Sequence, residues 1–407
     1  MPVYKQYLPE NRRNEIELLL CCARAVLNDE HTQFIKNIDQ KKVDWDHLIQ
    51  MSFDRRVMPL LYRNLIRSGS NRVPDEFMEK LRHRYLSNAT ENIYLTGELL
   101  KVLELLEGQN ILALPFKGPV LAQYLYGDIS LRQFSDLDLL IHRKDIIKTR
   151  ELLLANGYQD SMNLDDRQFM AFARIYTQNV FMSHDYRVNL ELHWEMSNRY
   201  ISNDFDIKKL NGCLETIDFS GKKVKNLQVN ELLFYLCLHG TKHHWETLEM
   251  IYCVAELIRS HPKIDWDRVI CLGTHMRSER TLFLGLFLAH DLYGVDLPYK
   301  ILNKIADDSM IYIIAKKVYN DLFRKDEIPA ELSIKFRNFL YHMNVRNRFS
   351  EKIWFCVEKL IRPKVADWVV FPLPATLSFL HYLLRPIRLA YKWTMRIPDL
   401  IRSGPLF

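Results

Sequence analysis

Two aspartates, Asp136 and Asp138, stand two residues apart in the apolar run DLDLLI. Side chains on a β-strand alternate between its two faces, so a strand here places both carboxylates on one face. Two like charges at this spacing on a half-buried strand need a compensating cation or a basic partner. Mg²⁺ suits this role because it prefers oxygen ligands and takes one or two carboxylates together with substrate phosphates. The spacing therefore predicts a magnesium site.

The same Asp-x-Asp spacing also occurs where no metal is needed. It is found at Asp44 and Asp46, at Asp265 and Asp267, and at Asp204 and Asp206. The first two pairs open predicted helices, where an aspartate satisfies free backbone amides and favours the helix dipole. The third pair lies in a polar connecting stretch. Only the pair at 136 and 138 lies among branched aliphatic residues, which favours the metal interpretation there.

A glycine turn precedes these two aspartates. The apolar run Ile111 to Phe116 predicts a strand, Lys117 and Gly118 follow it, and the next residues (VLAQYLYG after Pro119) have helical spacing. A strand, a glycine turn and a helix can offer backbone amides to a phosphate. Arg132 follows a turn-like segment (GDIS), so we expect it to be exposed and either to neutralise the aspartates or to hold a phosphate.

A third carboxylate is predicted on a hairpin further along the chain. Val180 to Met182 and Val188 to Trp194 flank the residues SHDYR, which is typical of two strands joined by a short loop. In the second strand Glu191 and His193 alternate with apolar residues and therefore share one face. His193 is a candidate contact for the substrate.

A set of short motifs surrounds these residues. They are Lys117-Gly118, Leu121-Ala122, Tyr124, Tyr126, Arg132, Asp136-Leu137-Asp138 and Glu191-Leu192-His193-Trp194. Together they resemble the uncharacterised nucleotidyltransferase family of the DNA polymerase beta-like superfamily. The similarity continues through LCLHGTKHHWETL (residues 236–248) and an RP…DW…LP stretch near the C-terminus, so it covers most of the chain.

The resemblance implies a site as well as a fold. In that superfamily a glycine turn precedes an Asp-x-Asp strand, and a later strand supplies a third acid. Asp136, Asp138 and Glu191 would then form the catalytic, metal-binding triad, and Gly118 would be the glycine of the phosphate-side turn.

This chain departs from the pattern at two positions. Pro119 follows Gly118 where relatives carry serine or glycine, which leaves the phosphate contact to Lys117 or to backbone amides. Cys253 stands where we expect an aspartate in many relatives.

The activity that the resemblance implies is Mg²⁺-dependent nucleotidyl transfer, in which an acceptor hydroxyl attacks the α-phosphate of an NTP and pyrophosphate leaves. Two Mg²⁺ ions about 3.5–4 Å apart are implied, with Mn²⁺ as the alternative metal. Glu191 would help to deprotonate the acceptor, and Lys117, Gly118 and Arg132 would bind the nucleotide. The acceptor would be a sugar, another small molecule, a protein or RNA, and the sequence does not choose among them.

A histidine-rich segment, HGTKHH, offers a separate interpretation. His239 and His243 are four residues apart and share a helix face, which is one way to bind zinc. No third ligand follows at a recognisable spacing, and Lys242 between them opposes a cation. Packing or hydrogen bonding is the favoured role, a phosphate or substrate contact by His239, Lys242 or His243 is the second, and metal is the third.

Composition sets outer bounds on function. The chain has 407 residues, 48% apolar and 26% charged, with a formal net charge of +6. This suits an anionic substrate but lacks the clustered basic stripe of a dedicated DNA-binding protein. The seven cysteines are unevenly spaced, and some lie in apolar helix-like runs, which indicates reduced thiols in a cytoplasmic protein. The first residues do not have the apolar core of a signal peptide.

The predicted fold class is α+β, with a polymerase-beta-like nucleotidyltransferase core (a small mixed sheet with helices) between two helical regions. Apolar residues at three- and four-residue steps predict helices throughout residues 1–107. Strand and helix patterns then alternate through the nucleotidyltransferase core, residues 108–225. A C-terminal helical domain follows over residues 226–361, with breaks near His261-Pro262 and Leu297-Pro298.

Residues 362–407 form a basic, aromatic tail. Its run from Trp368 to Leu384 has no charged residue, but Pro372 and Pro374 interrupt it, so the run is too short to span a bilayer about 30 Å thick. We expect it to pack on the helical body, with peripheral contact to anionic lipid as the alternative.

Two other functions stay open from the sequence. One is a non-catalytic nucleotide-binding or scaffold protein that keeps the fold, which the Gly118-Pro119 turn favours. The other is a peripheral membrane partner of glycan or lipid biosynthesis, which only the tail favours.

Overall fold

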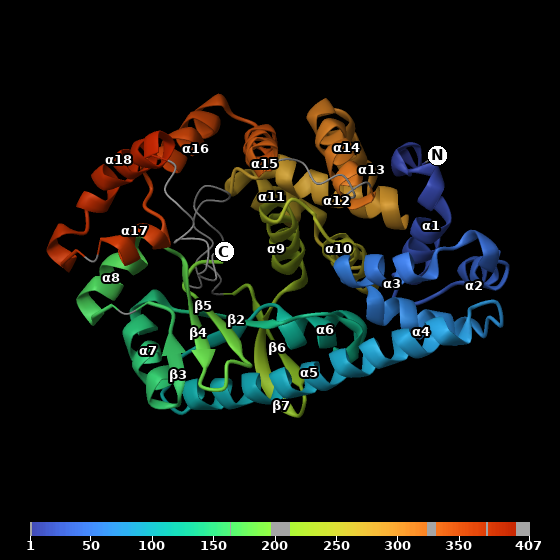
Figure 1. Cartoon of the computed structure of the whole chain (residues 1–407), viewed down its shortest axis with the longest axis horizontal. Coiled ribbons are helices and arrows are strands. Elements are labelled where there is room, and N and C mark those ends of the chain that lie inside the picture. The colour runs from blue at the N-terminus through green and yellow to red at the C-terminus, as the bar shows by residue number, and fades with distance from the viewer. Residues whose placement is uncertain (1, 163, 197–211, 324–330, 372, 396–407) are drawn as a thin grey trace.

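The structure is a computed structural model that describes residues 2–162, 164–196, 212–323, 331–371 and 373–395 (Figure 1). It has the mixed α+β class expected from the sequence, because one small sheet lies between helical segments that precede and follow it in the chain.

Five strands form the central sheet, in the order β1-β2-β5-β4-β3. They are β1 (Ala113–Pro115), β2 (Asp136–Ile141), β3 (Tyr158–Asp160), β4 (Gln178–Ser183) and β5 (Asn189–His193). β2 and β5 run parallel, whereas the other neighbours in the sheet are antiparallel. The strand predicted around the two aspartates and the hairpin predicted around SHDYR are both confirmed.

The N-terminal region is helical, as predicted. Its helices are α1 (Arg13–Cys22), α2 (Asp29–Lys36), α3 (Trp45–Asp54), α4 (Met58–Ser68) and α5 (Asp75–Glu107). α3 and α4 are separate helices, because Arg56 between them has a left-handed backbone (φ 56°). Asp44 and Asp265 cap helices by accepting backbone N–H bonds, which confirms their predicted role. The third Asp-x-Asp pair, at 204 and 206, lies outside the described residues.

Helices and a second hairpin complete the middle of the chain. They are α6 (Gly118–Tyr126), α7 (Ile146–Ala155), α8 (Asp166–Ile175), β6 (Leu214–Phe219) and β7 (Lys222–Leu227). The helices after them are α9 (Val229–Lys242), α10 (Leu248–Ser260), α11 (Trp266–His275), α12 (Glu279–Tyr293), α13 (Tyr299–Ala306), α14 (Ser309–Phe323), α15 (Glu331–Val345) and α16 (Phe349–Ile361). The breaks predicted near His261 and Pro298 are present.

The two faces of β2 belong to different cores. Leu137 and Leu139 lie in one apolar core with residues of α5, which runs beneath the sheet in Figure 1. Leu140 lies in the other core, together with residues of α9, which stands above the sheet. Asp136 and Asp138 alternate with the first two leucines, so they lie on the α9 side. The sheet therefore presents its carboxylates to the helical region that follows it in sequence.

The tail only partly packs as expected. Trp368 on α17 (Val365–Val370) is buried, and its ring lies 5.7 Å from that of Phe172 on α8. On the segment that includes α18 (Leu380–Met395), however, Phe379 and Leu383 are exposed. The expectation that this apolar run packs back on the body is thus only partly right: Trp368 is buried and Leu373, Leu380 and Leu384 are half-buried, whereas other apolar side chains of the run face solvent.

The cysteines and the lengths of the helices are relevant to two expectations from the sequence. All seven cysteines are free thiols, and five of them are buried. No helix among the described residues is both long enough and apolar enough to cross a membrane.

Candidate active site

The candidate site lies where β2 and β5 run side by side. In the register of this parallel pair Asp138 is opposite Glu191, and His193 shares the face of Glu191 because it is two residues further along β5. One ligand atom from each of Asp138, Glu191 and His193 lies within 4.8 Å of the others. Sheet register alone therefore gathers two carboxylates and an imidazole.

Asp138 is the central member of this group. Lys117 Nζ donates a hydrogen bond of 2.6 Å to its Oδ1, and His193 Nε2 lies 3.0 Å from the same oxygen. Burial alone would raise the pKa of Asp138, but the charge of Lys117 and the hydrogen bond with His193 outweigh it and hold the pKa below its usual value. Asp138 is therefore ionised at neutral pH. Its Oδ2 is buried and has no hydrogen-bond partner among the described residues, which leaves a lone pair available to a ligand.

Glu191 is held from two sides. Gln178 Nε2 on β4 donates a bond of 2.8 Å to Glu191 Oε2, and His193 Nε2 lies 3.4 Å from the same atom. Burial opposes ionisation, but the hydrogen bond with His193 lowers the pKa of Glu191 below its usual value. Glu191 is thus a second carboxylate that is ionised at neutral pH and fixed in orientation.

Asp136 occupies a different environment, although it lies on the same strand. It is not in the group of described residues whose ligand atoms lie within 4.8 Å of one another. Burial, followed by the charge of Asp138, raises its pKa above the usual value. The two aspartates therefore differ. The ammonium of Lys117 stabilises the ionised form of Asp138, whereas the ionised form of Asp136 is less stable because it is buried.

The glycine turn delivers Lys117 to this group. Lys117 is the N-cap residue of α6, and Gly118 has a positive φ of 55° that favours glycine. Pro119 lies in the first turn of the helix, where its missing N–H costs nothing, but it also offers no amide to a phosphate. Burial would lower the pKa of Lys117, yet the charge of Asp138 raises it, so the ammonium is retained.

Helix α9 supplies the facing wall. The facing wall belongs to a small pocket of about 10 Å³, which is lined by Lys117, His193, Met196, Tyr235, Leu238, His239 and Lys242. Burial, and then the charge of Lys117, lowers the pKa of both His239 and Lys242. His243 is not among the lining residues, but its ring lies 4.6 Å from that of His239, and burial lowers its pKa to about 3. Among the residues that the structure describes, no acidic side chain forms an ion pair with His239 or Lys242 on this wall.

A comparison with family models decides the family. The model for the uncharacterised nucleotidyltransferases matches residues 41–294, more than half of the chain. The chain belongs to this uncharacterised nucleotidyltransferase family. The match runs from the start of α3 to the end of α12 and does not extend to the C-terminal stretch where the sequence similarity was expected to continue. No curated protein and no solved structure matches the chain.

Arg132 was predicted to bind a phosphate and to be exposed, and the prediction that it is exposed is wrong. Its side chain is buried, its Nε donates a 2.6 Å bond to Glu249 Oε1 on α10, and Nη1 lies 3.5 Å from the carbonyl oxygen of Gly118. Burial would lower the pKa of Arg132, but the charge of Glu249 raises it. Its charge is therefore used to join the sheet region to α10.

Cys253, the expected replacement for a family aspartate, lies in the same buried network. Its Sγ donates to Glu249 Oε1 at 3.1 Å, and the hydroxyl of Tyr126 on α6 lies 3.4 Å from the sulfur. Glu249 therefore accepts from both Arg132 and Cys253, and the network holds α6 and α10 together.

Two residues beside the candidate site were missed from the sequence. Tyr235 faces Lys117 and packs edge-on against Phe116 with ring centroids 5.3 Å apart. Its position four residues before His239 places it on the same helix face, which was an available signal. Gln178 orients Glu191 from the neighbouring strand, and only the strand register reveals that contact.

Proposed function

We propose that this chain is a divalent-metal-dependent nucleotidyltransferase that moves a nucleoside monophosphate from an NTP to an acceptor hydroxyl. One observation carries the proposal: two ionised carboxylates and an imidazole converge beside a pocket whose other wall is basic. A metal and a triphosphate are the ligand pair that complements both walls.

The residues fit a metal ion. Asp138 and Glu191 provide hard oxygen donors, Asp138 Oδ2 is buried without a partner, and His193 adds a nitrogen donor within the same 4.8 Å group. Carboxylates suit both Mg²⁺ and Mn²⁺, and the imidazole favours Mn²⁺ somewhat more than an all-oxygen site does. When bound, such an ion supplies charge neutralisation for the triphosphate. Asp136, on the same face of β2, is a further donor for an ion, as the resemblance to the superfamily implies.

The basic groups of the pocket would bind the phosphates. Lys117 neutralises Asp138 in the structure, and its ammonium lies at the boundary between the acidic cluster and the α9 wall. A phosphate group at this small pocket would give His239 and Lys242 an anionic partner, and it would give Lys117 a second one beside Asp138. The lowered pKa values of His239 and Lys242 reflect the cost of charging them without one.

Glu191 would accept the proton of the acceptor hydroxyl. It is ionised because its pKa is lowered, and Gln178 and His193 fix its orientation. General-base catalysis by a positioned carboxylate contributes about 10²–10⁴-fold to a rate.

Labelled nucleotides test the proposal. The full-length protein is incubated with cell extract, Mg²⁺ or Mn²⁺, and NTPs labelled at the α- or the γ-phosphate. Transfer predicts that α-label enters a product while γ-label appears in pyrophosphate, and that Glu191→Gln removes both signals. Glu151→Gln, an exposed change on α7, is the matched control. Release of γ-label as orthophosphate, with no α-label in any product, would contradict nucleotidyl transfer.

A non-catalytic nucleotide-binding protein is the second candidate. The Gly118-Pro119 turn lacks a hydroxyl, and the ion pair of Lys117 with Asp138 satisfies part of the acidic cluster without a metal. Isothermal titration separates the two candidates: nucleotide binding without turnover for any NTP would favour this one.

A further inference from the structure

Helix α16 exposes an apolar stripe. Ile353, Trp354, Val357, Leu360 and Ile361 are all exposed, and their spacing places them along one face of the helix. Trp354 alone is 63% exposed. A helix of a globular protein normally turns such a stripe toward the core. On α16 the core side is occupied by Phe355, which is buried.

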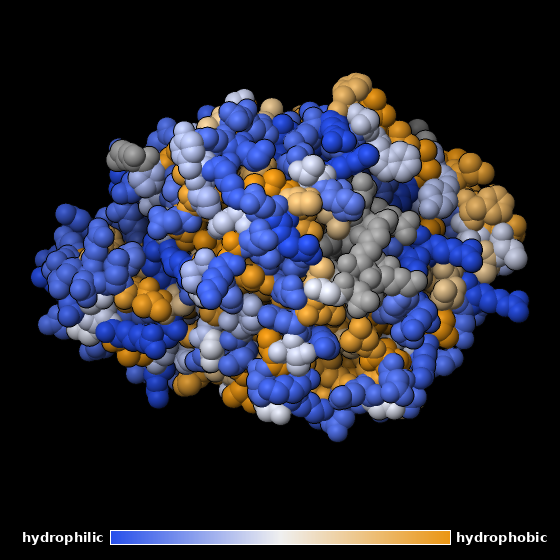
Figure 2. Space-filling view, turned by 180° about the vertical axis from the view of Figure 1, so that it is seen from behind, coloured by the Kyte–Doolittle hydropathy of each residue, from blue (hydrophilic) through white to orange (hydrophobic). Residues whose placement is uncertain are grey.

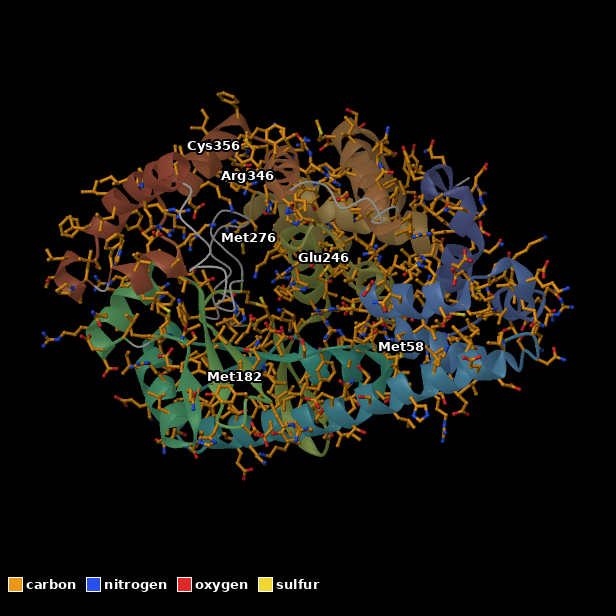
Figure 3. All side chains as sticks on the ribbon, viewed as in Figure 1. Met58, Met182, Glu246, Met276, Arg346 and Cys356 are labelled. Atoms are coloured by element: carbon orange, nitrogen blue, oxygen red, sulfur yellow. The ribbon has the colours of Figure 1, made fainter. Side chains whose placement is uncertain are left out.

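Helix α18 repeats the pattern beside it. Phe379, just before the helix, and Tyr382, Leu383 and Ile387 within it are exposed at the same three- and four-residue steps. α16 and α18 pack against each other. These helices lie at the upper left of Figure 1, and Figure 3 labels Cys356 on α16. Figure 2 views the molecule from behind, so the same rim is at the upper right, where orange and tan atoms gather. The exposed residues of the two stripes together are called the C-terminal face below.

The positive charge of the chain is concentrated in the same segment. Residues 348–395 contain eight Lys or Arg and three Asp or Glu, a net charge of +5, so the rest of the chain contributes only +1 of the total +6. All three acids have basic partners. Glu358 pairs with Arg362, Glu351 lies near Arg348, and the buried Asp367 pairs with Arg385 and Arg388. The segment therefore combines exposed apolar side chains with a net positive charge.

We propose that the C-terminal face docks on a membrane surface that contains anionic lipid. Apolar and aromatic side chains beside basic ones are the features by which interfacial helices bind such a surface. Each basic residue near an anionic surface adds attraction, while the apolar side chains enter the headgroup region. The segment lies beyond residue 294, where the family match ends, so docking is a property of this chain's C-terminal part and stands independently of the proposed function.

The positive charge of the segment argues against a second copy of the chain as the partner of this face. Two copies of the chain that met through it would bring two segments of +5 together, and like charges across an interface oppose association. An anionic bilayer complements the charge and the apolar stripes at once. The face is also held on the body rather than hanging free, because Gln168 on α8 donates to the carbonyl oxygen of Leu373 at 3.1 Å and Trp368 is buried.

Vesicle co-sedimentation of the full-length protein tests this. Vesicles of phosphatidylcholine alone are compared with vesicles that also contain phosphatidylglycerol, at low and at high salt. We expect sedimentation with the anionic vesicles at low salt and at least a tenfold weaker partition onto neutral ones. Trp354→Glu and Leu383→Glu, each at an exposed position, should each reduce the partition about fivefold or more. Tyr299→Glu on α13, where the side chain is 78% exposed away from this face, is the matched control and should bind as wild type does.

Two further measurements keep the outcome decisive. Thermal melts of each variant establish that the fold is intact, as expected for exposed positions. Light scattering coupled to size exclusion gives the oligomeric state without vesicles. Equal sedimentation with neutral and anionic vesicles, none with either, or a dimer that Trp354→Glu dissociates would each overturn the proposal.

Discussion

Asp138→Asn should destabilise the metal-free protein, whereas Asp136→Asn should not. The spacing of the two aspartates suggests that removing either charge relieves repulsion. The structure distinguishes them, because Lys117 donates a 2.6 Å hydrogen bond to Asp138 in a buried ion pair whose side chains are 12% and 1% exposed. Burial raises the pKa of Asp136, so ionisation of this carboxyl group costs more free energy.

The magnitude follows from the burial of that pair. Removing one partner of a buried ion pair costs about 3–5 kcal/mol, because the other charge stays buried without compensation. We expect about 3 kcal/mol for Asp138→Asn, since the amide oxygen can still accept a hydrogen bond from Lys117. At about 2–4 °C per kcal/mol this lowers the melting midpoint by about 6–12 °C. Asp136→Asn should leave the midpoint unchanged or raise it.

The pH dependence gives an independent check on the sign. The pKa of Asp138 is lowered and that of Lys117 is raised in the folded state. The stability from Asp138 is therefore present above its unfolded pKa of about 3.9 and is lost as the pH falls through the lower folded value. The stability from Lys117 is present below about pH 10.4 and is lost as the pH rises through the higher folded value. The loss of stability caused by Asp138→Asn should be constant between those two pH limits and should become smaller in acid.

Calorimetry of metal-free wild type, the two single variants and Lys117→Met/Asp138→Asn supplies the assay. The double variant removes both charges and should recover much of the loss, since replacing a whole buried pair costs far less than breaking it. If Asp138→Asn melts with wild type, or if the double variant is no more stable than the single one, then the ion pair does not carry the stability assigned to it here.

Three further outcomes are expected. Arg132→Met should destabilise the protein by about 3–5 kcal/mol in a denaturant titration, because Glu249 loses its buried partner, and nucleotide affinity measured below the transition should not change. Lys242→Met should weaken nucleotide binding about 10–100-fold, which corresponds to the loss of one charge-assisted hydrogen bond. The nucleotide affinity of the wild type should fall as the pH rises through the lowered pKa of Lys242, whereas Lys242→Arg should keep its affinity to higher pH. Trp368→Ala, at a residue 1% exposed, should cost about 3–5 kcal/mol in the same denaturant titration, while Trp354→Ala should stay within about 0.5 kcal/mol of wild type.

Local patterns predicted the elements of the site well. Polar and apolar residues alternate around Asp136, Asp138 and Glu191, and this pattern predicted the two strands. The same pattern placed each acid on the correct face of its own strand. The N-caps at Asp44 and Asp265 were predicted for the same reason, because a cap depends on the next few residues only. Such features are encoded within one turn of a helix or one strand.

Contacts between distant segments could not be predicted in this way. Arg132 pairs with Glu249, 117 residues away, and no local pattern distinguishes that buried pair from an exposed phosphate ligand. The position of His193 within reach of Asp138 depends on the parallel register of β2 and β5, which one sequence does not fix. The role of Tyr235 depends on how α9 crosses the sheet.

The helical region after the sheet is therefore part of the site rather than a support for it. α9 covers the carboxylate face of β2, and its burial of Asp138 strengthens the ion pair with Lys117 because the local dielectric is low. The same burial makes His239 and Lys242 costly to charge, as their lowered pKa values show. The sheet side of the pocket is acidic, and the basic groups on its helix side have lowered pKa values. A ligand that brings a cation to the carboxylates and a polyanion to the basic groups compensates both sides at once. A metal-bound triphosphate is such a ligand, and it is the ligand that the proposed nucleotidyl transfer requires.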